Sequence, residues 1–171
     1  MKRYYSILLI AFAVMTTACD PDYEVSDYFD LEELPGYVAF DADGNNARID
    51  DVETDENGGT TELIIENPTG TLSDITVNYA LSGTAMFGTD YTIEGASAAG
   101  GSLTIVPNSG AVNETARVTL TITLLTDDVA DGEKTITVSL SDASNAEGTI
   151  AVGRGGTDFL KVANVIIADV D

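Results

Sequence analysis

The chain has 171 residues, which suits one domain with extensions, and its 44% of hydrophobic residues excludes a disordered acidic tail. It carries 29 acidic against 7 basic side chains, a formal net charge of −22, and so acidic a surface argues against nucleic acid or anionic lipid as a partner. The chain has no histidine, which excludes a Ser-His-Asp or Cys-His catalytic site and a histidine-ligated zinc site.

The first eighteen residues have the features of a secretory signal peptide. Lys2 and Arg3 precede an apolar run at residues 7–15, which is too short to span a bilayer, since a spanning helix needs about 20 apolar residues. Small residues then lead to Cys19, the only cysteine of the chain. A lone cysteine cannot form an internal disulfide, and a free thiol is a liability in an exported protein.

The segment around Cys19 resembles the lipobox of bacterial lipoproteins, in which a small residue precedes an invariant cysteine. Thr17, Ala18 and Cys19 carry the resemblance, and Thr16 stands where leucine is usual. The resemblance implies cleavage after residue 18 and lipidation of Cys19. Two or three acyl chains on one residue anchor a protein stably. The alternative is an ordinary signal peptide followed by a free thiol.

Residues 19–35 are predicted to form the lipidated cysteine and an acidic tether. The tether has seven acidic residues and no basic one. Asp20, Asp22 and Glu24 resemble the export signal of surface lipoproteins in one group of Gram-negative bacteria, and a plain flexible linker is the alternative. We therefore expect a protein that is lipid-anchored in the bacterial outer membrane, at its periplasmic or cell-surface face.

From residue 36 to residue 171 the sequence alternates with a period of two. Apolar residues alternate with Thr, Ser or Asn, which is typical of half-buried strands, and Gly- and Asn-rich clusters separate these segments. This pattern predicts an all-β fold, a two-sheet antiparallel immunoglobulin-like sandwich. The expected strands are residues 37–40, 60–66, 75–81, 101–107, 116–125, 134–141 and 162–169.

Two loops look like ligand motifs but are predicted to be plain turns. Residues 41–53 have many oxygen-bearing side chains, but Gly44 is at the fourth place of the loop rather than the sixth, which disfavours an EF-hand. Residues 153–156, GRGG, do not follow the dinucleotide-binding pattern and are expected to form a hairpin loop.

Residues 52–171 resemble the Calx-beta domain. The segment VNYALSGTAMFGTDYTI, residues 77–93, is similar to the signature of that family. Four further segments resemble the family in the same order, at residues 56–59, 101–110, 127–141 and 165–171. The residues of the central segment that carry the resemblance are Val77, Tyr79, Gly83, Thr84, Ala85, Gly88, Asp90 and Tyr91.

The chemistry of this segment leads to three expectations. Gly83 and Gly88 suit sharp bends that need a positive φ or close packing. Tyr91 is expected to pack its ring in the core. Asp90 would place a charge beside a buried ring, and such a charge needs a partner.

The resemblance also implies a calcium site at one pole of the sandwich, as in the sodium–calcium exchangers. Calcium takes six to eight oxygen ligands, and converging carboxylates need a counter-ion. Three departures predict weaker binding, in the range of about 10⁻⁴–10⁻³ M: Thr126 and Lys134 stand where acids are expected, and so does Val170. The alternative is a solvated acidic end. The implied ligands are Glu56, Asp90, Asp127, Asp128, Asp131, Asp169 and Asp171, with Glu133 beside them.

The sequence therefore predicts a lipid-anchored binding or adhesion module and not an enzyme. Its partner would be a protein or glycan at the cell surface, with calcium as the cofactor that the resemblance implies. One alternative is a metal-free structural spacer or an accessory domain of a surface complex. Another is a carbohydrate-binding module, which the absence of tryptophan disfavours but seven tyrosines leave open.

Overall fold

The computed structural model describes residues 36–42, 49–108, 115–126 and 129–170 of the chain. These residues belong to one compact unit, residues 34–171. Cys19 and the predicted ligands Asp127, Asp128 and Asp171 lie outside the described residues. In the described part, no helix is long and apolar enough to cross a membrane.

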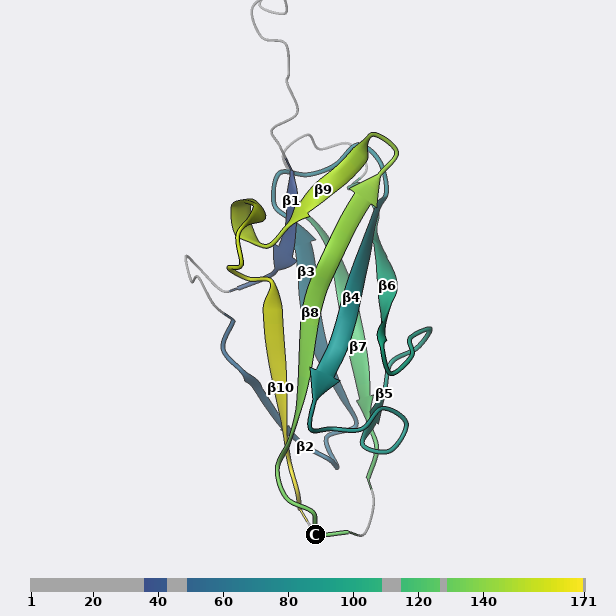
Figure 1. The fold of residues 1–171 in the computed structure, drawn as a ribbon, viewed down its shortest axis with the longest axis vertical. Helices are drawn as coiled ribbons and strands as arrows, with labels where there is room; N and C mark the ends of the chain where they lie inside the picture. Colours follow the sequence, from purple (N-terminus) through teal and green to yellow (C-terminus); the bar gives the residue numbers. More distant parts are fainter. Residues whose placement is uncertain (1–35, 43–48, 109–114, 127–128, 171) are drawn as a thin grey trace, which may run out of the picture. The chain divides into compact units, whose positions relative to one another are not determined.

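Ten strands make up the described part of the fold (Figure 1). All seven expected strands are present, and most of their ends agree to within two residues; β8 runs four residues further than predicted. Three short strands, β2, β5 and β9, were not predicted. The strands are β1 (Tyr37–Phe40), β2 (Val52–Asp55), β3 (Thr60–Asn67), β4 (Ile75–Gly83), β5 (Tyr91–Thr92), β6 (Gly100–Ile105), β7 (Ala116–Leu124), β8 (Lys134–Asn145), β9 (Gly148–Val152) and β10 (Val162–Ala168).

The strands lie in two layers that one pairing joins. One layer holds β1, β3, β7 and β5, all antiparallel to their neighbours. The other holds β2, β10, β8, β4 and β6. Strand β9 pairs with β8 in the second layer and with β1 in the first. In Figure 1, β3 and β7 accordingly lie behind β8 and β4.

The all-β class is confirmed, but two separate antiparallel sheets are not. The pairing of β9 with β1 is parallel and makes the hydrogen-bonded network one ten-stranded sheet. A second parallel pair joins β2 to β10. Each pair includes one short strand, β9 or β2, that the sequence analysis did not predict.

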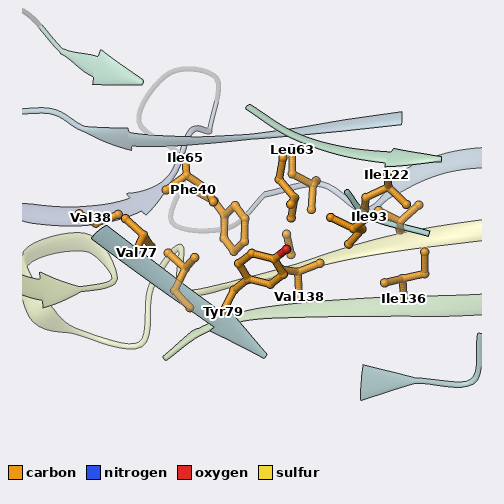
Figure 2. Close-up of a cluster of buried hydrophobic side chains, with 14 of the residues drawn as sticks. Val38, Phe40, Leu63, Ile65, Val77, Tyr79, Ile93, Ile122, Ile136 and Val138 are labelled. Atoms are coloured by element: carbon orange, nitrogen blue, oxygen red, sulfur yellow. The ribbon is translucent and has the colours of Figure 1, made fainter. Parts of the chain in front are cut away.

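The core fills the space between the two layers. Along β7 the exposed residues Arg117, Thr119, Thr121 and Thr123 alternate with residues that turn inward, as the period of two predicted. Figure 2 shows Leu63, Ile65 and Ile122 facing Val77, Tyr79 and Val138, with the ring of Phe40 beside that of Tyr79. Burying one such aliphatic or aromatic side chain contributes about 1.5–3 kcal/mol, so this cluster holds the layers together.

The GRGG segment is a turn but not a hairpin loop, so that part of the prediction is wrong. It forms the 3₁₀ helix η3 (Arg154–Gly156) between β9 and β10, which do not pair with each other. Gly153 has a φ of +83°, and a Cβ there would lie 1.9 Å from the carbonyl oxygen of Thr157. The glycines in the sequence therefore predicted the tight turn. They did not predict that the strands on either side of the turn, β9 and β10, pair with other strands and not with each other.

Candidate site at the acidic pole

Four acidic side chains lie around Lys134 at one end of the sandwich. We call Glu56, Asp90, Asp131, Asp169 and Lys134 the acidic pole; together they line one small depression. Of the predicted ligands in the described residues, only Glu133 does not line it. The depression has a volume of about 10 Å³, which is room for roughly one water-sized sphere.

Strand pairing explains why residues so far apart in sequence meet here. Glu56 follows β2 and Asp169 follows β10, and these strands are parallel neighbours, so their carboxyl ends lie at the same edge. Strand β8 runs antiparallel to β10, with Lys134 opposite Ile167, so the start of β8 reaches the same edge. Figure 1 shows the end of β10 and the segment leading into β8 together near the chain end.

Asp90 reaches the acidic pole through a tight loop between β4 and β5. Gly88 has a φ of +83°, as the sequence predicted, and its N–H donates to the carbonyl of Tyr91 at 2.7 Å. The ring of Tyr91 is buried at 2% exposure and meets Phe87 edge to face, with 5.6 Å between ring centroids. The predicted burial of Tyr91 is thus confirmed, and the buried ring holds the neighbouring Asp90 at the rim of the core.

The partner that Asp90 needs is Lys134. The side chain of Asp90 is 7% exposed, and its Oδ1 lies 2.7 Å from the Lys134 Nζ. Its Oδ2 accepts a hydrogen bond from the Met86 N–H. The Lys134 ammonium also donates to Asp131. Both carboxyl oxygens of Asp90 are therefore engaged, one by a cation and one by the backbone of its own loop.

The other two acids of the pole bind backbone N–H groups. Asp169 Oδ2 accepts from the Gly132 N–H. Glu56 Oε1 accepts from the Val170 N–H at 3.1 Å, while the Glu56 carbonyl accepts from the Thr126 hydroxyl at 3.0 Å. These bonds tie the segments after β2, β7 and β10 to one another.

The described residues do not fit a calcium ion in this arrangement. Each of the four acids already accepts a hydrogen bond from a backbone N–H or from the ammonium. No group of three or more acidic, histidine or cysteine residues among those the structure describes is arranged to hold a metal.

The electrostatics of the pole follow from these contacts. Hydrogen bonds to Asp131 and Asp90 raise the pKa of Lys134 above its ordinary value, so the ammonium stays charged at neutral pH. Burial raises the pKa of the Tyr91 hydroxyl, and the negative charge of Asp90 raises it further. At neutral pH the pole therefore holds a charged lysine ammonium next to a neutral phenol.

Sequence analysis identified both members of this pair but did not connect them. It marked Asp90 as an acid without a partner and Lys134 as a basic residue in an acidic position. The two are 44 residues apart, and no spacing rule links residues at that distance. The signal that could have paired them is that Asp90 is an acid that needs a partner and Lys134 is a base at a position where an acid is expected.

Replacing Asp90 with asparagine tests the structural role of this pair. Asp90→Asn keeps the shape of the side chain but removes the charge that holds Lys134, so we expect a loss of about 2 kcal/mol in the free energy of unfolding, the usual range for a hydrogen bond to a charged group. Urea denaturation measures it. Asp74→Asn, at an exposed position, is the control and should change stability by less than about 0.5 kcal/mol. Equal effects of the two variants would contradict the role given to Asp90.

One further cavity was not foreseen. It has a volume of about 360 Å³ and lies between β1, β3 and the residues that lead into β2, with walls that include Phe40, Leu63, Asp50 and Asp51. Next to it, Arg117 binds Asp41 at 3.3 Å and Glu66 at 3.1 Å. Burial and Asp41 raise the pKa of Glu66, and Arg117 opposes them. The walls come from separate strands, which is why no local pattern revealed the cavity.

Comparison with known proteins identifies the fold. No protein-family model matches the sequence, and no curated protein is significantly similar to it. Among solved structures, the apo form of the Calx CBD1 domain superposes with a TM-score of 0.55 at 19% identity, covering 81% of this chain and 100% of that one. The chain has the fold of the Calx CBD domains.

Two other solved structures agree. The Calx CBD2 domain gives a TM-score of 0.53 at 17% identity and covers 79% of this chain and 87% of that one. The calcium-binding domain CBD12 of CALX1.1 gives 0.52 at 20% identity, with 81% of this chain and 45% of that one covered. The Calx-beta resemblance seen in residues 52–171 is thus confirmed at the level of the fold.

Proposed function

We propose that this chain is a non-enzymatic binding or adhesion module that a lipid on Cys19 holds at the bacterial outer membrane. The observation that supports the proposal is the Calx CBD fold, one solved example of which is named as a calcium-binding domain. The lack of any histidine, which removes the commonest catalytic bases, supports a role without catalysis. The lipobox-like segment at residues 17–19 supports the anchor.

One exposed surface suits a protein or glycan partner. Thr119, Thr121 and Thr123 are exposed on β7, and Thr60, also exposed, pairs with Thr123 across the sheet. Hydroxyl groups both donate and accept hydrogen bonds, which matches the hydroxyl and amide groups of glycans and peptides. The exposed Glu62 of β3 pairs with Thr121, so this surface offers hydroxyl groups beside one carboxylate.

The proposed function does not depend on calcium. CBD12 of CALX1.1 is named as a calcium-binding domain, but the corresponding pole of this chain holds an ammonium beside its acids. Calcium binding by this chain stays a prediction of the sequence, and a binding module can present its surface without it.

Replacing the lipidated cysteine tests the anchor. Cys19→Ser removes the acceptor of the acyl chains, and a module without a lipid or a spanning segment has no strong hold on a bilayer. We expect the wild-type chain in the membrane fraction with incorporated labelled fatty acid, and the variant without label and mostly outside that fraction. Ala18→Ser, which keeps a small residue before the cysteine, is the control. A variant that stays in the membrane fraction as fully as wild type would contradict lipid anchoring at Cys19.

The same strains separate binding from a spacer role. Cells with the wild-type chain should attach to immobilised extracellular polysaccharide or protein more than cells with the Cys19→Ser chain. Equal attachment, with equal amounts of chain produced, would favour a metal-free structural spacer.

A further inference from the structure

We infer that Lys134 is the built-in counter-ion of the acidic pole and takes the place that a divalent cation would hold there. The pole is then closed by the protein's own ammonium group and needs no metal to keep its shape. This inference is independent of the proposed binding function, because a module with either kind of counter-ion can bind a partner.

The position of the ammonium is the first argument. Its Nζ lies 2.7 Å from Asp90 Oδ1 and also binds Asp131, so it bridges acids from two separate loops. A bridging position between carboxylates from different segments is where a divalent cation would act. Lys134 therefore joins the loops of Asp90 and Asp131 as a divalent cation would, but with a single positive charge.

Burial is the second argument. The side chain of Asp90 is 7% exposed and that of Lys134 is 20% exposed, so water screens this pair less than a surface pair. Two carboxylates close together repel one another unless a positive charge lies between them. Without Lys134, Asp90 would be a nearly buried charge that keeps the hydrogen bond from the Met86 N–H but loses its ion pair.

The third argument is that the backbone of Lys134 is held in place by its neighbours. Lys134 is the first residue of β8, where it pairs with Ile167 of β10. The next residue, Thr135, accepts hydrogen bonds from the N–H groups of Thr84 and Ala85 through its carbonyl and donates its own N–H to the Thr84 hydroxyl. The start of β8 is thus held on both sides, so the ammonium is presented at a set place.

The test is the effect of calcium on thermal unfolding of the full-length chain in detergent. Wild-type protein should have the same melting temperature in about 5 mM calcium chloride and in chelator. Lys134→Met removes the charge and keeps the length of the side chain. We expect its melting temperature to fall by about 5 °C and to recover at least half of that fall in calcium, because the freed carboxylates then lack a counter-ion.

Lys161→Met is the matched control. Lys161 is a partly exposed lysine that lies 3.8 Å from the fully exposed Asp158, so its variant removes the same charge from a surface pair. We expect a melting temperature near that of wild type and no response to calcium. Lys134→Arg, which restores a positive charge, should recover most of the stability lost in Lys134→Met.

Three results would overturn the inference. One is a calcium-dependent rise in the melting temperature of wild type. Another is a Lys134→Met variant as stable as Lys161→Met. The third is a Lys134→Met variant that calcium leaves unchanged. If Lys134→Met does not fold, Asp131→Asn carries the test, because it removes one acid and leaves the ammonium on Asp90; that variant should melt lower without responding to calcium, and a calcium response would count against the inference.

Discussion

Gly83→Ala is expected to destabilise the protein strongly. Gly83 ends β4 with a φ of +119°, and a Cβ there would lie 2.0 Å from the Thr135 carbonyl oxygen. That carbonyl cannot move away freely, because the N–H groups of Thr84 and Ala85 both donate to it. The substitution therefore forces β4 away from β8, and we expect a loss of at least about 4 kcal/mol from a typical total of about 5–15 kcal/mol.

Gly88→Ala separates the clash from backbone strain. Gly88 also has a positive φ, +83°, but a Cβ there would meet nothing within 4 Å. It should cost only the about 1–2 kcal/mol that an L-residue loses in a left-handed conformation. Circular dichroism with urea denaturation measures both variants. Losses of the same size would mean that close packing against Thr135 contributes nothing.

Phe40→Ala is expected to cost about 3–5 kcal/mol, the range for removing a fully buried aromatic ring. Phe40 has 0% exposure, and Figure 2 shows its ring next to Tyr79 between the two layers. Phe40 is the last residue of β1. Strand β1 pairs with β3 in its own layer and with β9, and β9 also pairs with β8 of the other layer. The cavity left by the ring would therefore weaken the packing where the layers are joined.

Phe159→Ala provides the comparison for this loss. Phe159 is 55% exposed, and its hydrogen bonds with Arg154 and Thr157 use its backbone carbonyl and N–H groups, which alanine keeps. We expect a change below about 0.5 kcal/mol in the same urea experiment. A Phe40→Ala loss no larger than that of Phe159→Ala would show that Phe40 is not part of the packed core.

At the acidic pole, the sequence predicted most of the acidic residues but not their contacts. The resemblance selected Glu56, Asp90, Asp131 and Asp169, and the structure places all four around one depression. Glu133 does not line it, and Asp127, Asp128 and Asp171 lie outside the described residues. The ion pair of Asp90 with Lys134 was not foreseen, because local patterns carry no information on contacts between loops 44 residues apart.

The sequence by itself determined seven of the ten described strands, the alternation of apolar and polar residues along them and the positive φ of Gly83 and Gly88, because alternation and glycine chemistry act over a few residues. Tertiary structure alone decided the parallel pairing of β9 with β1 and of β2 with β10. It also decided that the Lys134 ammonium pairs with Asp90 at the acidic pole. The physical reason is that a short strand or a single charge finds its partner only once the rest of the chain has fixed both in space.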